Sequence, residues 1–191
     1  MDETKQKIIN ATMLLLKEKG YVATTTKDIA NLAQVNECTI FRKFKNKKEI
    51  VLSGLEQEQW RANVTPAIFR NVTWELQADL EMFMRNYLER VTADFVKLSI
   101  GLRAPQINEE TIPHIMKIPE AFLQSLINYF EKMHEKGEIA NLDFECLAMT
   151  ILSSTFGFTF LKASFGDQLS QVTQQEYITK SVALFLKGIK D

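Results

Sequence analysis

Residues 23–50 concentrate Thr, Lys, Arg and aromatic side chains, which are types that contact nucleic acids. Ile40 and Phe44 are spaced as the buried side of a short helix, which leaves their polar and basic neighbours on its outer side. On a helix in the DNA major groove, polar side chains bond base edges while Lys and Arg hold phosphates. The residues on or near the outer side are Glu37, Cys38, Thr39, Phe41, Arg42 and Lys43. This pattern predicts a helix-turn-helix that binds DNA.

Local signals predict the helices that would position this surface. The amphipathic stretch 4–19 predicts a first helix, which Gly20 would end. Thr25 is a suitable N-cap for a short second helix. Asn46 begins a pattern like a capping box, and it predicts a longer linking helix over 47–63.

Five short segments between residues 20 and 50 form an ordered motif. They are Gly20-Tyr21, Thr25-Thr26-Lys27-Asp28-Ile29-Ala30, Val35-Asn36, Thr39-Ile40-Phe41-Arg42-Lys43-Phe44 and Asn46-Lys47-Lys48-Glu49-Ile50. Together they resemble the N-terminal signature of the TetR family of bacterial transcriptional repressors, over about residues 8–52. Gln34 and Phe41 stand where that signature usually has Gly and Tyr, and Cys38 replaces a small residue. The resemblance implies a three-helix DNA-binding domain.

The resemblance also implies which side chains contact DNA. By motif position, base contacts are expected from Thr26, Lys27, Glu37, Thr39 and Lys43, and phosphate contacts from Thr25, Arg42 and Lys47. Phe41 is expected against the sugar-phosphate wall or a thymine methyl group. The implied partner is double-stranded DNA with a palindromic operator. The alternative is a solvated charged face on an ordinary helical hairpin.

Charge is unevenly distributed along the chain. Residues 1–55 hold ten Lys and Arg against six Asp and Glu, although the whole chain has a net charge of -1. A basic end on an acidic body indicates that the N-terminal part meets a polyanion. The charged N-terminus lacks the apolar core of a signal peptide, and two separated cysteines are typical of a reduced, cytoplasmic protein.

The composition predicts an all-α fold, because the 191 residues include only 7 Gly and 4 Pro. We expect an N-terminal helix-turn-helix domain over 1–50 and a larger helical ligand-binding and dimerisation domain over 51–191. Helical patterns in the second domain cover 74–91, 93–102, 119–137, 144–165 and 173–189. The proline-containing stretch 103–119 predicts a loop with at most a short helix.

A stripe of aromatic residues and methionines marks the second domain. Most of these side chains are expected in the core, but a ligand pocket in a helical domain is lined by the same types. The candidates for binding a small apolar or aromatic ligand are Trp60, Trp74, Phe83, Met84, Tyr87, Phe95, Arg103, Phe122, Leu126 and Phe156.

The last two helices are predicted to form a homodimer interface. Residues 146–161 carry no charge, but this run is shorter than the about 20 residues of a membrane span, so a buried interface is preferred. The resemblance implies that two such helices from each copy form a four-helix interface, the alternative being internal core. The candidates are Ile151, Ser154, Gly157, Phe158, Leu161, Val182, Phe185 and Ile189.

Neither histidine belongs to a metal-binding or nucleophile motif, so we predict no catalytic residue, no metal and no cofactor. The combined prediction is a cytoplasmic, homodimeric repressor that an apolar ligand releases from its operator. One alternative is a helical protein-interaction module in which the helix-turn-helix is structural only. The other is a small-molecule enzyme.

Overall fold

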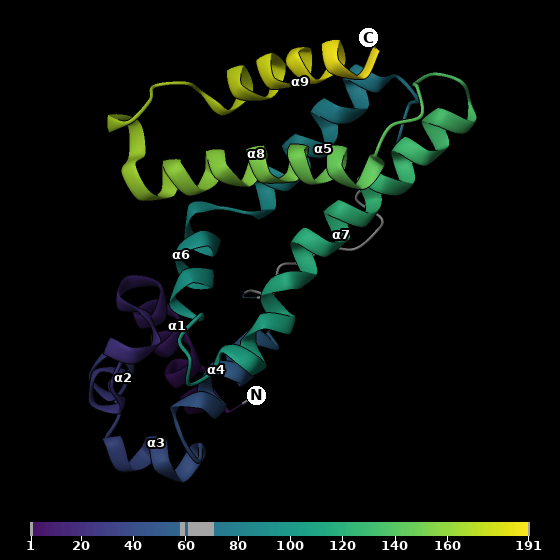
Figure 1. The fold of residues 1–191 in the computed structure, drawn as a ribbon. Coiled ribbons are helices and arrows are strands. Elements are labelled where there is room, and N and C mark those ends of the chain that lie inside the picture. Colours follow the sequence, from purple (N-terminus) through teal and green to yellow (C-terminus); the bar gives the residue numbers. More distant parts are fainter. Residues whose placement is uncertain (1, 58–59, 61–70, 191) are drawn as a thin grey trace. The chain divides into compact units, whose positions relative to one another are not determined.

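The computed structural model describes residues 2–57, 60 and 71–190, and every regular element in this part of the chain is helical (Figure 1). The helices are α1 (Glu3–Ala23), α2 (Thr26–Ala33), α3 (Glu37–Lys43), α4 (Lys47–Leu55), α5 (Leu76–Arg90), α6 (Ala93–Gly101), α7 (Asn108–Glu135), α8 (Phe144–Phe165) and α9 (Gln174–Lys190), with a 3-10 turn, η2 (Gly166–Gln168), after α8. The predicted all-α class is confirmed. The chain packs as two units: unit 1 comprises Met1–Asn63 and Asp94–Met116, and unit 2 comprises Val64–Ala93 and Lys117–Asp191.

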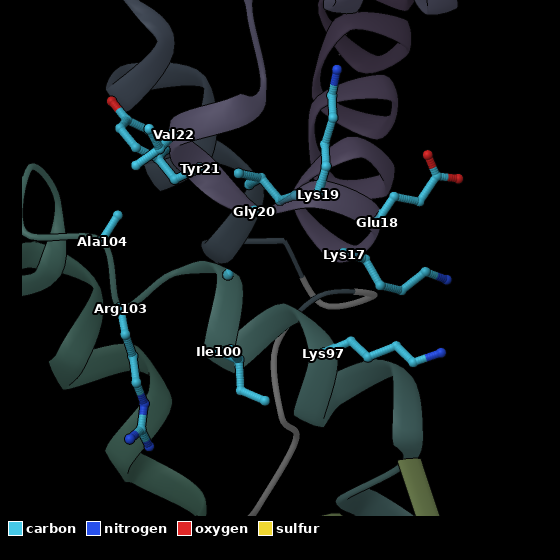
Figure 2. Close-up of a pocket in the computed structure, with 12 residues that line it drawn as sticks. Lys17, Glu18, Lys19, Gly20, Tyr21, Val22, Lys97, Ile100, Arg103 and Ala104 are labelled. Atoms are coloured by element: carbon cyan, nitrogen blue, oxygen red, sulfur yellow. The ribbon is translucent and has the colours of Figure 1, made fainter. Parts of the chain in front are cut away.

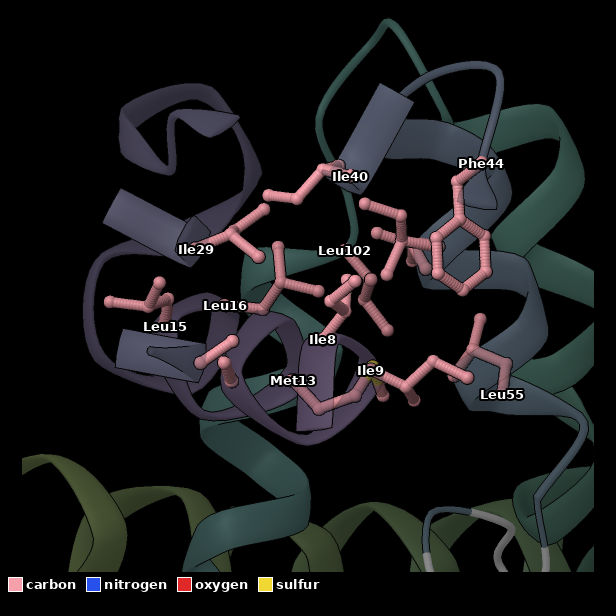
Figure 3. Packing of buried hydrophobic residues seen from close by; sticks show 14 of the residues in the cluster. Ile8, Ile9, Met13, Leu15, Leu16, Ile29, Ile40, Phe44, Leu55 and Leu102 are labelled. Carbon is pink, nitrogen blue, oxygen red and sulfur yellow. The ribbon is translucent and has the colours of Figure 1, made fainter. Parts of the chain in front are cut away.

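The core of unit 1 forms around one side of α1. Apolar residues recur there at helical spacing, so α2, α3 and α4 can close over the same side. The segment that contains α6 completes the cluster from a distant part of the chain. Its central members are Ile8, Met13, Leu16, Ile29, Ile40, Leu55, Leu98, Leu102 and Ile107. Figure 3 shows the members from α1 to α4 together with Leu102. The helix-turn-helix therefore shares its core with residues beyond the predicted domain boundary.

The last turn of α1 breaks at Gly20, where φ is 73° and ψ is 176°. The first helix thus loses its regular course at the predicted residue, although helical structure resumes up to Ala23. A β-carbon on Gly101 would lie 2.5 Å from the Leu16 carbonyl oxygen and 3.2 Å from the Gly20 α-carbon. The ends of α1 and α6 therefore meet backbone to backbone, an approach that glycine permits.

Helix α4 is shorter than predicted. Its N-cap Asn46 accepts a hydrogen bond from the backbone amide three residues later at 2.9 Å, as the capping pattern predicts. The helix ends at Leu55 and a turn follows, so it does not continue unbroken to residue 63. Residues 58–59 and 61–63 of the predicted linking helix lie outside the described residues.

The prediction of a loop over 103–119 is wrong for most of these residues, which are helical. Helix α7 begins at Asn108 and runs for 28 residues through Pro113 and Pro119. A proline inside a helix removes a backbone hydrogen bond and costs about 3 kcal/mol. Burial offsets this cost: Thr111 is fully buried, and its hydroxyl donates to a backbone carbonyl oxygen nine residues earlier at 2.8 Å. Tertiary packing therefore outweighs the local signal.

In unit 2, buried Asp79 organises the chain before α5. Its Oδ1 accepts hydrogen bonds from the amide and hydroxyl of Thr73 at 2.7 and 2.9 Å. Its Oδ2 accepts from the Trp74 amide at 2.8 Å and the Tyr129 hydroxyl at 2.9 Å. These bonds hold Trp74 at φ 65°, which costs a residue with a side chain about 1–2 kcal/mol. Burial and the nearby Asp79 raise the pKa of Tyr129, so its hydroxyl stays protonated and donates.

Helix α8 begins and ends at the predicted residues, and α5 packs against both α8 and α9 within unit 2. By length and composition, residues 144–168 are apolar enough to cross a membrane, and 28% of their most apolar window is buried. One chain therefore leaves much of the apolar surface of α8 open.

Candidate nucleic-acid interface

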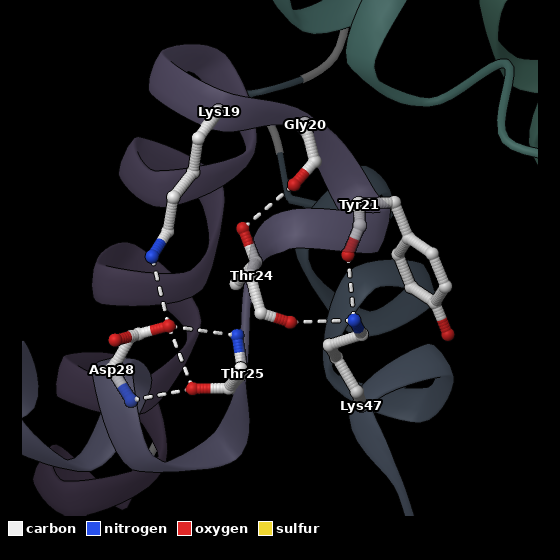
Figure 4. Close-up of polar contacts among 7 residues, drawn as sticks. All are labelled: Lys19, Gly20, Tyr21, Thr24, Thr25, Asp28 and Lys47. Atoms are coloured by element: carbon white, nitrogen blue, oxygen red, sulfur yellow. Dashed lines mark hydrogen bonds and ion pairs between the residues drawn. The ribbon is translucent and has the colours of Figure 1, made fainter.

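A capping box holds the start of α2 (Figure 4). The Thr25 hydroxyl oxygen accepts from the Asp28 amide at 3.1 Å, and the Asp28 carboxylate accepts from the Thr25 amide at 3.0 Å. The Lys19 ammonium pairs with the same carboxylate at 2.8 Å. Lys19, followed by Thr25, holds the pKa of Asp28 well below its usual range. The Thr25 hydroxyl therefore caps α2. A phosphate contact by the same hydroxyl stays a prediction.

The turn between α2 and α3 places Gln34 in the left-handed region, with φ 54°. The Gln34 amide donates to the carbonyl oxygens of Ala30 and Asn31, and the Val35 amide donates to Ala30 at 3.0 Å. Glycine favours this arrangement at the end of a helix. Gln34 makes the same turn at a cost of about 1–2 kcal/mol. The departure from the family pattern therefore affects stability and leaves the turn geometry in place.

Helix α3 presents a polar and aromatic outer side over a buried inner side. Ile40 is fully buried and Phe44 nearly so, as their spacing predicts. Phe41 is 56% exposed, and Arg42 also faces solvent. Asn36 caps the helix, since its side-chain oxygen accepts a hydrogen bond from the amide two residues later at 2.8 Å. The Phe41 ring and the Arg42 cation are therefore both accessible to a binding partner.

Two of the predicted base contacts bind each other. The Thr26 hydroxyl donates to the Glu37 carboxylate at 2.5 Å and so joins the first residue of α2 to the first residue of α3. Lys27 is exposed on α2, and Thr39 is half-buried on α3. The structure therefore places these four residues on the two helices of one helix-turn-helix.

The Lys47 side chain binds groups of its own chain. Its ammonium donates to the carbonyl oxygens of Tyr21 and Thr24 at 2.6 and 2.5 Å, and lies 4.0 Å from the centre of the Tyr21 ring (Figure 4). Burial lowers the pKa of Lys47. Because an ammonium has three N–H groups, a phosphate contact by Lys47 depends on the one that remains.

Two further cations lie near the end of α3. The ammonium of Lys43, the last residue of the helix, pairs with Asp2. Lys45 is exposed two residues later. Lys45 was not singled out from the sequence, and its only signal there was its position between α3 and the cap of α4.

The predicted ligand-pocket residues divide between the units. Those buried in unit 2 are Phe83, Met84, Tyr87, Phe122 and Leu126. The Tyr87 and Phe122 rings meet edge to face with centroids 4.7 Å apart, so they fill core space. Trp74 and Phe83 line a cavity of about 230 Å³ beside Tyr129. Phe156 is half-buried, with the centre of its ring 6.2 Å from that of Phe160.

Trp60, Phe95 and Arg103 belong instead to unit 1. Arg103 is exposed and lines a groove of about 550 Å³ between the end of α1 and α6 (Figure 2). Lys17 lines the same groove and pairs with Asp94 at 2.9 Å. One pocket shared by all ten predicted residues stays a prediction.

The predicted dimer-interface residues differ in their burial. The side chains of Ile151, Val182 and Ile189 are at most 2% exposed and lie in the core of their own chain. Their place at a dimer interface stays a prediction. Ser154, Gly157, Phe158 and Phe185 are half-buried, and Leu161 is exposed. Larger open apolar surface comes from Met149, Phe165, Leu169 and Leu184. Because α8 is apolar on all sides, its sequence did not indicate which side faces outward.

Comparison with known proteins extends this picture. Residues 8–53 match the family described as bacterial regulatory proteins, tetR family. The uncharacterized HTH-type transcriptional regulator YvkB of Bacillus subtilis is 35% identical over 189 residues, which cover 99% of this chain and 98% of that protein. IcaR, the HTH-type negative transcriptional regulator of the biofilm operon icaADBC in Staphylococcus epidermidis, is 28% identical over 144 residues, covering 72% and 77%.

The fold also matches a solved structure along almost its whole length. The structure of the transcriptional regulator FadR from Bacillus subtilis, in complex with stearoyl-CoA, aligns with a TM-score of 0.68 at 22% identity and covers 96% of this chain and 98% of that one. The matched family segment contains the capping box, the turn at Gln34 and the outer side of α3. Because the likeness to YvkB extends over nearly both entire chains, this protein belongs to the TetR family of DNA-binding transcriptional regulators.

Proposed function

We propose that the protein is a cytoplasmic, homodimeric repressor that binds a palindromic operator and leaves it when an apolar small molecule binds. The observation that carries the DNA-binding part is the outer side of α3, where Phe41 and Arg42 are exposed above buried Ile40 and Phe44. A helix of this kind reads base edges while nearby cations neutralise phosphates. The likeness to IcaR, described as a negative regulator, supports repression.

A homodimer would match the two half-sites of a palindrome. The open apolar surface of α8 and α9 supports this assembly, since large exposed apolar patches mark interaction sites. Leu184 of α9 is 69% exposed and Phe165 of α8 is 54% exposed. We propose that a second copy covers this surface in place of lipid, and that Ser154, Gly157 and Leu161 take part.

An apolar ligand is supported by the aromatic residues of unit 2 and by the stearoyl-CoA in the FadR structure. Trp74 and Phe83 already line a small cavity there. To release DNA, the ligand must bind the released conformation more tightly than the DNA-bound one. A ligand with equal affinity for both conformations would leave repression unchanged.

The proposal is tested by selecting bound duplexes from a random DNA pool, and then measuring affinity for the selected duplex over a series of salt concentrations with and without long-chain acyl-CoA. Arg42→Ala should lower the slope of log affinity against log salt by about one unit. Lys180→Ala, which removes an exposed cation from α9, is the matched control and should leave the slope unchanged. If no duplex is retained in a salt-dependent way, the helix-turn-helix is structural only.

A further inference from the structure

Asp2 joins the start of α1 to the end of α3. Its Oδ1 accepts a hydrogen bond from the Thr4 amide at 3.0 Å, which caps α1. Its Oδ2 pairs with the ammonium of Lys43, 41 residues later in the chain. The two side chains are 37% and 28% exposed, so solvent and a bound polyanion can both reach the pair.

The pair changes what Lys43 can offer to DNA. An ammonium binds phosphate through its charge, but it binds a base edge through its N–H donors. Asp2 cancels the charge and occupies one N–H group, while two N–H groups remain for other acceptors. Exposed Arg42 and Lys45 lie beside Lys43 in the chain and supply charge for phosphates. Lys43 is thereby better suited to base acceptors, such as N7 and O6 of guanine, than to phosphate.

We propose that Asp2 is a specificity-determining residue, which removes the charge of Lys43 from non-specific phosphate binding and leaves its N–H groups for base recognition. This inference rests on the proposed function, because Lys43 must lie at the DNA. Non-specific affinity comes almost entirely from charge neutralisation. Asp2 should therefore weaken binding to arbitrary DNA more than binding to the operator, and so widen the gap between them.

Asp2→Asn separates the charge of Asp2 from its capping role. Asn caps a helix about as well as Asp, so the variant should keep the cap of α1 and lose only the ion pair with Lys43. Glu3→Gln is the matched control, because it removes a neighbouring carboxylate that, among the described residues, pairs along α1 with Lys7. Both variants raise the net charge by one unit near the same helix start.

The first measurement tests the pair without DNA, by NMR titration of the Asp2 carboxyl group. The Lys43 ammonium lowers the pKa of Asp2 below its ordinary value. In Lys43→Ala this pKa should rise toward the ordinary value of about 3.9 for Asp. The same pKa in both proteins would show that the pair does not form, and would overturn the inference.

The second measurement compares the selected operator with a duplex of scrambled sequence across a salt series. Asp2→Asn should bind the scrambled duplex about three- to tenfold more tightly at about 0.1 M salt, with a salt slope steeper by about one unit. Operator affinity should rise less, so the ratio of operator to scrambled affinity falls. Glu3→Gln should leave this ratio unchanged.

In the DNA-binding measurements, failure of the proposed function and failure of the inference give different results. If the native protein binds no duplex in a salt-dependent way, the proposed function fails and the inference fails with it. If the native protein binds its operator but Asp2→Asn strengthens binding to both duplexes equally, only the inference fails, because Asp2 then acts as one more negative charge near DNA.

Discussion

The ammonium group of Lys47, the first residue of α4, donates a hydrogen bond to the carbonyl oxygen of Thr24 at 2.5 Å. Thr24 follows the last residue of α1. A second bond reaches the Tyr21 carbonyl oxygen at 2.6 Å. The broken end of α1 leaves these carbonyl groups without a regular helical partner, and a cation satisfies them. Lys47 thus fixes the path of the chain from α1 into α2.

Lys47→Ala should therefore destabilise the protein by about 1 kcal/mol, because it removes hydrogen bonds to a charged donor that is partly screened by solvent. Thermal unfolding would measure the loss, with Lys45→Ala as the exposed neighbouring control, which should change little. The salt slope of operator binding separates the two roles of Lys47. An unchanged melting temperature with a slope lower by about one unit would favour a phosphate contact over the clamp.

Asp28 gives a prediction about pH. Its pKa is lowered in the folded protein, chiefly by Lys19, so its stabilising effect is complete above the unfolded value of about 3.9 and disappears as pH falls below it. Asp28→Asn should melt at a lower temperature than the native protein by a constant margin above about pH 5. Below about pH 4 the margin should shrink. A margin that grows on acidification would contradict this assignment.

Gly101 tests the contact between α1 and α6 within unit 1. A methyl group there would lie 2.5 Å from the Leu16 carbonyl oxygen, so the backbone must move. We expect Gly101→Ala to cost about 1–3 kcal/mol in denaturant unfolding, as overpacking does. Gly188→Ala on α9 meets no atom within 4 Å among the residues described, and should be neutral or slightly stabilising. Equal stability of the two variants would argue against the close contact.

Gly157 tests the proposed dimer. A β-carbon at this position of α8 meets no atom within 4 Å in the described part of its own chain, so Gly157→Leu should leave the protomer folded. If a partner helix approaches here, the larger side chain should weaken association, and sedimentation velocity should show more monomer. Ala140→Leu, an exposed change outside α8, is the control. An intact Gly157→Leu dimer would place the interface on another face.

The helix-turn-helix could be predicted in detail because its signals are local. Thr25, Asn36 and Asn46 each cap a helix through an amide two or three residues away, and all three bonds are present. The burial of Ile40 and Phe44 followed from helical spacing alone. Such signals act within a few residues, where sequence order and spatial order are nearly the same.

The features that were missed depend on distant partners. The sequence did not indicate that the ammonium of Lys47 bonds carbonyl groups more than twenty residues earlier, and its phosphate contact stays a prediction. The stretch 103–119 was expected to be a loop with the next helix beginning at Pro119, but α7 begins at Asn108 and continues through both Pro113 and Pro119. The sequence did not indicate that the core of unit 2 buries Ile151, because α8 is apolar on all its sides. The helix propensity of a segment does not indicate which distant residues it contacts in the folded chain.

The discontinuous core of unit 1 bears on how the protein is made. Residues 1–55 contain α1 to α4, which include the helix-turn-helix, yet Leu98, Leu102 and Ile107 belong to the same cluster. During synthesis the first four helices are joined to the chain before these three residues exist. A nascent chain halted near residue 90 would hold a helix-turn-helix with an uncovered apolar flank, a natural binding site for a chaperone. The DNA-reading part of this regulator is therefore encoded early in its gene but can be completed only after more than half of the chain has been translated.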